Sequence, residues 1–113
     1  MIETTVLNYL SQKTTAPIRF ERSPDMPEKC IVIEKTGSSY NEELYTATMA
    51  IQSYGKTLAE AAALNTDVIR WMLAMRDTEQ NIFDVSLNSD YNFTDSATKR
   101  YRYQAVFVIT YNQ

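Results

Sequence analysis

The chain has 113 residues, of which 44% are hydrophobic and 22% are charged, a composition typical of one folded domain. Its net charge of −3 disfavours the wrapping of nucleic acid by phosphate neutralisation. With no histidine and one cysteine, the sequence excludes an intramolecular disulfide, histidine-dependent catalytic triads and the usual zinc ligand sets. We therefore expect a single domain over residues 1–113, with no enzymatic activity, catalytic residue, cofactor or metal.

The first half of the chain predicts one short helix and three strands. Apolar residues at helical spacing indicate an amphipathic helix over 2–13. The polar sequence GSSYNEE, residues 37–43, predicts a loop that joins two strands into a hairpin. Alternating or β-branched runs place the three strands at residues 18–21, 30–35 and 44–54.

The second half predicts a long helix followed by two strands. Thr57 and Glu60 have the spacing of a capping box, in which Glu60 reaches back to the amide of the cap residue. We expect this helix to run from Thr57 to about Arg76, with an inner apolar stripe of Ala61, Leu64, Val68, Met72 and Met75. The next strand is expected to have one apolar face, formed by Phe83, Val85, Leu87, Tyr91 and Phe93.

The final strand, RYRYQAVFVITY, alternates more regularly than any other segment. Its odd positions from Tyr101 to Tyr111 are tyrosine or apolar, so we expect them to face the core. Arg100, Arg102 and Gln104 then share the opposite face, which a neighbouring subunit could meet. For the basic cluster that includes Lys99, a solvated or subunit-contacting face is favoured over nucleic-acid binding.

The order of elements is α-β-β-β-α-β-β. Sequential hairpins on each side of one long helix indicate an α+β fold. We expect an antiparallel or mixed β-sheet, with the long central helix and the short N-terminal helix packed on one face.

The segment NSDYNFTD resembles the start of a calcium loop, because Asn88, Asp90 and Asn92 have the spacing of oxygen ligands. Phe93 occupies the place of the required glycine, and Lys99 stands where the bidentate glutamate is needed. A calcium site is therefore rejected. Cys30 precedes a β-branched run and is expected to be a small buried residue rather than a reactive thiol.

Tyrosine is abundant, with 8 residues, and its ring suits both cores and interfaces. For Tyr40, Tyr45, Tyr54, Tyr91 and Tyr103 the two roles remain open. The loops 37–43 and 88–99, together with the hairpin 30–54, are candidate subunit contacts. The residues predicted to form an interface are Tyr40, Glu42, Glu43, Tyr45, Tyr54, Tyr91, Asp95, Arg100 and Arg102.

Three stretches carry a family resemblance across nearly the whole chain: RFERSPDMPEKCIVIEKTGSS, IQSYGKTLAEAAALNTDVIRWM and SLNSDYNFTDSATKRYRYQAVFVITY. They resemble small minor capsid proteins of long-tailed bacteriophages and prophages, similar in layout to tail terminator, or tail-completion, proteins. The most specific parts are Y-x-F-T-D and R-Y-R-Y-Q-A-V-F. None of these is a catalytic signature.

The resemblance implies a structural role in virion assembly. The expected partners are further copies of the chain in a ring, usually a hexamer, the tail tube protein and the head–tail connector protein. DNA would pass through the lumen without specific binding, and no membrane would be involved. We expect assembly in the host cytoplasm and a final location in the tail or neck of the virion. The alternatives are a head-completion protein and a small-molecule-binding module.

Overall fold

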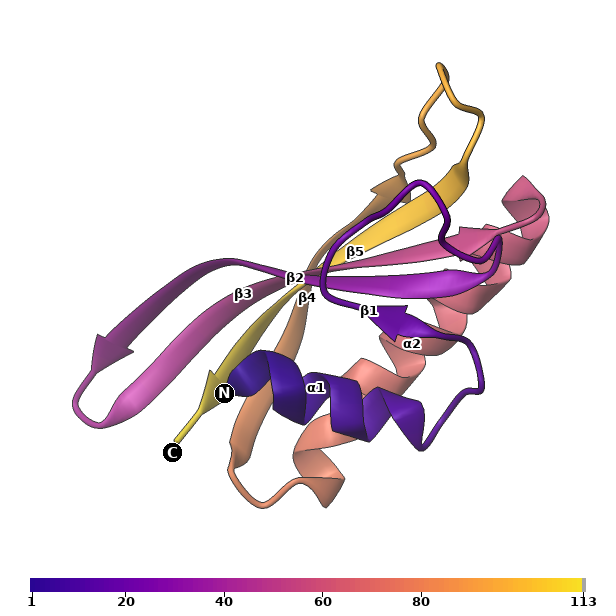
Figure 1. Cartoon of the computed structure of the whole chain (residues 1–113). Helices are drawn as coiled ribbons and strands as arrows, with labels where there is room; N and C mark the ends of the chain where they lie inside the picture. Colours follow the sequence, from indigo (N-terminus) through magenta and orange to yellow (C-terminus); the bar gives the residue numbers. More distant parts are fainter. Residues whose placement is uncertain (113) are drawn as a thin grey trace.

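The computed structural model describes residues 1–112, which form two helices and one five-stranded sheet (Figure 1). The α+β order predicted from the sequence is confirmed. In space the strands follow the order β1-β2-β3-β5-β4, and only the β1–β2 pair is parallel, so the sheet is mixed. The elements are α1 (Ile2–Ser11), β1 (Ile18–Arg19), β2 (Cys30–Asn41), β3 (Leu44–Gly55), α2 (Leu58–Thr78), β4 (Ile82–Asn92) and β5 (Tyr101–Tyr111).

Both helices cover one face of the sheet, here called the helix face. The predicted inner stripe of α2 is buried along its whole length, from Ala61 to Met75. Beneath it lie the odd positions of β5, of which Phe107 and Ile109 are fully buried, as the alternation predicted. α1 packs beside α2, and the Tyr9 hydroxyl donates to the Trp71 carbonyl at 2.6 Å. The apolar surface removed from water here is the main source of the fold's stability.

A tight connection joins β3 to α2. The Thr57 hydroxyl accepts a hydrogen bond from the Glu60 amide at 3.1 Å, which confirms the predicted helix start. The Glu60 carboxylate accepts from the Lys56 amide at 3.4 Å, one residue before the cap, so the predicted return bond to the cap amide is wrong. A Cβ atom at Gly55 would lie 2.5 Å from the Ala61 nitrogen, a distance that only glycine can accommodate.

The predicted loop over 37–43 is wrong, because β2 continues to Asn41 and pairs with β3 up to the turn. The turn itself consists of Glu42 and Glu43, whose φ angles are 50° and 69°. Two positive φ angles in succession are typical of the type I′ turn that closes β-hairpins. The segment lacks apolar alternation because both of its faces are exposed, which is why its sequence resembles a loop.

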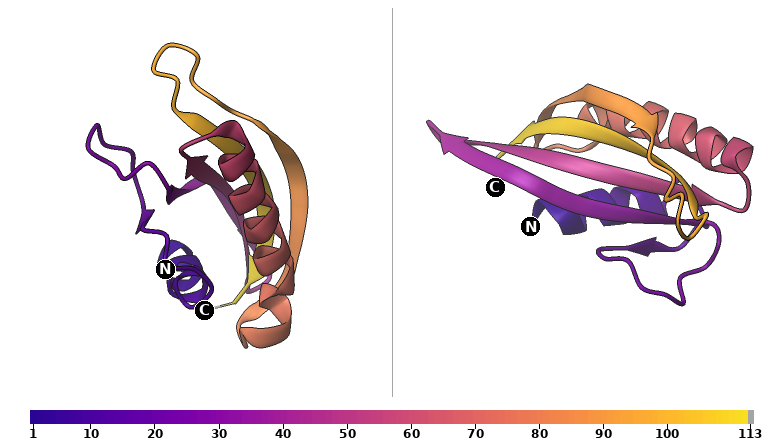
Figure 2. Two further views of the ribbon diagram at one scale, coloured as in Figure 1. Left: turned by 90° about the vertical axis from the view of Figure 1, so that its right-hand side faces the viewer. Right: turned by 90° about the horizontal axis from the view of Figure 1, so that it is seen from above.

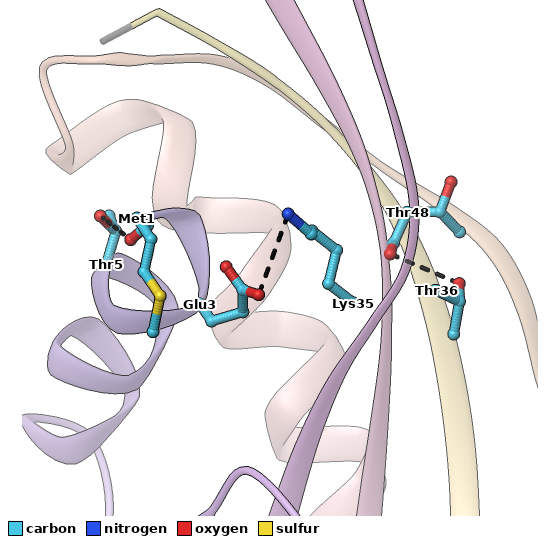
Figure 3. A network of polar contacts seen from close by, with 6 residues as sticks. All are labelled: Met1, Glu3, Thr5, Lys35, Thr36 and Thr48. Atoms are coloured by element: carbon cyan, nitrogen blue, oxygen red, sulfur yellow. Dashed lines mark hydrogen bonds and ion pairs between the residues drawn. The ribbon is translucent and has the colours of Figure 1, made fainter.

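Side chains at the base of this hairpin point in opposite directions (Figure 3). Lys35 reaches towards α1, where its Nζ lies 3.9 Å from Glu3 Oε2. On the other side, the Thr36 hydroxyl donates to the Thr48 carbonyl at 3.4 Å. A register shift follows between Lys35 and Gly37. Past this point β2 is exposed on both faces, whereas β3 stays paired with β5 as far as Tyr45, and the end of the hairpin extends beyond both helices (Figure 2).

β4 does not have the single apolar face that its alternation predicts. Register shifts lie between Ile82 and Asp84 and between Leu87 and Ser89. Ile82 is therefore buried in the core, whereas Phe83 is 52% exposed. Beyond the second shift, Tyr91 pairs with Gln104 on the opposite face of the sheet from Val85. Each extra residue reverses the direction of the side chains that follow it.

Candidate functional site

The face of the sheet opposite the helices, here called the rear face, is partly enclosed. Segments 20–29 and 93–100 lie on the side of the sheet away from α2 (Figure 2, right). Met26 packs against the buried side chains of Cys30, Val32 and Tyr54, and Arg100 donates to the Pro27 carbonyl at 3.1 Å. Together, the two segments surround a hollow on the sheet.

We call this feature the arginine hollow, and its volume is about 520 Å³. Its floor is the Tyr54 ring, and its walls come from both loops and from β5. Three arginines and one aspartate contribute the charged groups, so its formal charge is positive on a chain that is acidic overall. The lining consists of Arg22, Ser23, Pro24, Met26, Tyr54, Asp95, Thr98, Arg100 and Arg102.

Arg102 is held firmly by neighbouring oxygens and rings. Its Nε donates to the Phe93 carbonyl at 2.6 Å, and its terminal nitrogen donates to the Tyr54 hydroxyl at 3.0 Å. The guanidinium lies 4.3 Å from the centre of the Phe93 ring, within the range of a cation–π contact. Only 8% of the residue is exposed. The outward face predicted for Arg102 is correct, but loops rather than solvent cover most of it.

Two glutamines continue this polar network towards β4. The Gln52 amide donates to Gln104 at 2.8 Å, and Gln104 donates in turn to the Tyr91 hydroxyl. Gln104 is 8% exposed, and both the oxygen and the nitrogen of its side-chain amide are engaged within the chain, by Gln52 and Tyr91. The network fixes Tyr91 and Tyr54 relative to Arg102 and thereby stiffens the hollow.

In the part of the chain that the structure describes, the arginines of the hollow form no ion pair with a carboxylate. Within residues 1–112, the ion pairs are Lys35–Glu3, Arg70–Asp67 and Arg76–Asp84. Asp95 lines the hollow, but its carboxylate accepts hydrogen bonds from residues of its own loop. Hydrogen bonds from the Ala97 amide and from Thr98, followed by the charge of Arg102, lower the pKa of its carboxyl below the ordinary value. Asp95 therefore stays ionised in its own turn.

The other predicted interface residues meet at the tip of the hairpin. Tyr40 and Tyr45 lie opposite each other across the strands, with ring centres 4.5 Å apart. Tyr45 also stacks on Tyr111 of β5 at 5.4 Å. Glu42 and Glu43 form the turn beyond these rings and are exposed. The hairpin tip, residues 40–45, therefore carries two exposed carboxylates next to a pair of packed tyrosine rings.

The structure separates the predicted interface residues into two groups. Tyr40, Tyr45 and the two glutamates belong to the hairpin tip, whereas Tyr54, Asp95, Arg100 and Arg102 line the hollow. Tyr91 joins the second group through Gln104. Because β2 has 12 residues and a strand rises about 3.3 Å per residue, the groups lie roughly 35 Å apart.

Sequence reasoning missed Arg22 and Met26, which the 20–29 segment brings to the hollow. These residues are far from Arg102 in the chain, and no motif connects them. Cys30 was predicted correctly as a packed residue, since it is fully buried beside Met26. Burial raises the pKa of its thiol, although the charges of Arg100 and Arg19 oppose this effect.

Comparisons with known proteins leave the function open. No family model matches the chain, and no curated protein matches it. Over residues 1–112, neither helix has both the length and the apolar character needed to cross a membrane. The same part of the chain has no group of three or more acidic or cysteine side chains placed to bind a metal ion.

Proposed function

We propose that the protein is a structural component of a phage tail or neck. In this role it forms a ring of identical copies at the head-proximal end of the tail tube, ends tube polymerisation and joins the tail to the head. The observation that carries this proposal is the projecting hairpin. The distal half of β2 has both faces exposed and ends in an aromatic, acidic tip, so this half contributes little to the core and is suited to contacts with other chains, whereas β3 beside it stays part of the sheet.

The two edges of the sheet add to this argument. β1 pairs only with Ile31 and Val32, so the rest of the outer edge of β2 has no strand partner within residues 1–112. β4 pairs with β5 alone and forms the opposite edge. Unpaired edges bind further strands through backbone hydrogen bonds. The two edges differ from each other and lie on opposite sides of the subunit, so they favour head-to-tail association. Such association forms a ring when the rotation between neighbours closes.

The charge of the chain is compatible with DNA passage through such a ring. A net charge of −3 gives no general attraction to phosphates. DNA would then move through the lumen without being retained. The protein would leave the host cytoplasm as part of the virion.

The partner distinguishes this function from the alternative of a head-completion protein. The test is capture by tagged, immobilised protein of two purified candidates from the same genome, the tail tube protein and the portal or connector protein. Retention of tube protein supports tail termination. Retention of portal protein alone supports the head-completion role. Capture of neither, with the protein in excess, contradicts both assembly functions.

A further inference from the structure

We propose that the Glu42–Glu43 tip of one copy docks into the arginine hollow of the next copy. This inference rests on the proposed ring and specifies one contact that would build it. Three observations support it: a buried arginine that forms no ion pair within residues 1–112, an acidic turn held in an unfavourable backbone conformation, and the position of these two features at opposite ends of the hairpin.

The hollow carries an excess of positive charge, because Asp95 is the single carboxylate among its lining residues against three arginines. Arg102 is 8% exposed, and across residues 1–112 no carboxylate oxygen lies within ion-pair distance of it. A buried charge without a counterion at ion-pair distance is costly, and the ring contacts with Phe93 and Tyr54 and the more distant charge of Asp95 offset only part of that cost. An arriving carboxylate would be stabilised by Arg102 and by Arg100, which stands over the Tyr54 ring at 5.0 Å.

Acidic residues of the same chain do not fill this role. Glu21 and Glu34 line a neighbouring hollow that Arg102 also borders, yet neither forms an ion pair with it. Asp95 is engaged by the Ala97 amide at 3.0 Å. The arginine hollow is therefore open to an acidic group from outside the chain.

The tip offers such a group. Glu42 and Glu43 adopt φ angles of 50° and 69°, a region that costs a non-glycine residue about 1–2 kcal/mol. Asparagine and glycine are the residues that this turn favours. Glutamates at both positions make the hairpin less stable than it could be, and such local strain is typical of functional sites. In return for this loss of stability, the hairpin tip presents two carboxylates to other chains.

The positions of tip and hollow set the geometry of assembly. They lie at opposite ends of β2 and β3, because Cys30 and Tyr54 pair at one end and Asn41 and Leu44 at the other. One copy can therefore present its tip to a second copy while its hollow receives the tip of a third. This is a heterologous contact, the type that produces closed rings.

Charge reversal with rescue tests the contact. Glu42→Arg with Glu43→Arg reverses the tip, and Arg22→Glu with Arg100→Glu reverses the hollow but leaves the buried Arg102 in place. The matched control is Asp67→Arg with Asp77→Arg on α2, which changes the net charge as much as the tip variant does. Sedimentation velocity and equilibrium at low salt report the association, and circular dichroism confirms folding.

Each reversed variant should associate about tenfold or more weakly than the wild type, since a like-charge contact replaces an attractive one. The α2 control should associate like the wild type. An equimolar mixture of the two reversed variants should regain assemblies larger than dimers, because each tip again meets a hollow of opposite charge. Loss of association in the single variants together with recovery in the mixture supports the inference.

Any of three results overturns the docking contact. They are reversed variants that associate like the wild type, a mixture that does not recover, and a wild-type protein that stays monomeric or stops at a dimer at millimolar concentration. These outcomes leave the tail function to be judged separately by tube capture. A protein that assembles through tip and hollow but retains no tube protein contradicts the tail function alone.

Discussion

Gly55 permits the close approach between the end of β3 and the first turn of α2. A Cβ atom there would meet the backbone nitrogen of Ala61 at 2.5 Å, and neither chain segment can move without disturbing the start of α2. We predict that Gly55→Ala lowers the free energy of unfolding by about 1–3 kcal/mol. Gly37→Ala is the control, because its nearest neighbour is the Thr48 hydroxyl at 4.0 Å. Urea denaturation of both variants measures the difference, and equal effects would contradict the close approach.

The buried thiol of Cys30, on the rear face, makes the free energy of unfolding depend on pH. Burial raises the pKa of its thiol above the ordinary value of 9.0, so above that pH the unfolded chain loses a proton that the folded chain retains. The unfolded state then binds fewer protons, and the free energy of unfolding falls as pH rises. We predict that Cys30→Ala flattens this fall from about pH 9 upwards. Denaturation across this range measures it, and an unchanged slope would exclude Cys30 as the cause.

At the scale of elements, the N-terminus of α2 depends on one side chain. Thr57→Ala removes the hydroxyl that accepts from the Glu60 amide and should cost about 0.5–2 kcal/mol of stability. Thr66→Ala is the control, because Thr66 lies in the exposed interior of the same helix, where its hydroxyl bonds to the Ala62 carbonyl. That substitution should be neutral or slightly stabilising. Thermal unfolding separates the two, and equal losses would contradict a capping role.

We predict that Glu42 and Glu43 in the hairpin turn lower the stability of the fold but strengthen self-association. Glu42→Asn with Glu43→Gly matches the positive φ angles of the turn and should raise the free energy of unfolding by roughly 1 kcal/mol. The same variant removes both carboxylates and should therefore weaken self-association. Denaturation and sedimentation of one preparation measure both quantities. A variant with no gain in stability would show that the turn is not strained by its glutamates.

The order of elements and the buried stripe of α2 were predictable because their residues recur with the period of the structure that they form. The projecting half of β2 was not, since a strand with two exposed faces has no apolar alternation. Nor could sequence show that register shifts move Tyr91 to the rear face, because the bulges depend on pairing with β5. The sequence predicted individual interface residues, which remain predictions, but their division between the hairpin tip and the arginine hollow depends on the fold.

The whole molecule is elongated, with extents of 44 × 24 × 22 Å. The turn of the β2–β3 hairpin lies at one end of the molecule, and the segments 20–29 and 93–100 lie away from it (Figure 1). These two segments contribute the lining of the arginine hollow together with Tyr54 and Arg102. In the proposed ring, the acidic tip and the arginine hollow at opposite ends of the subunit would make the assembly directional. The edges of β2 and β4 would add contacts between neighbours once the tip is docked.

The most direct test of the tail-termination proposal measures the length of tubes assembled in its presence. Purified tail tube protein from the same genome is polymerised with the wild-type protein or with the tip-reversed variant, and negative-stain electron microscopy records lengths and ends. We predict shorter tubes that carry a ring at one end with the wild type, and long uncapped tubes with the variant. Tubes of unchanged length, with no added density at either end despite excess wild-type protein, would contradict tail termination.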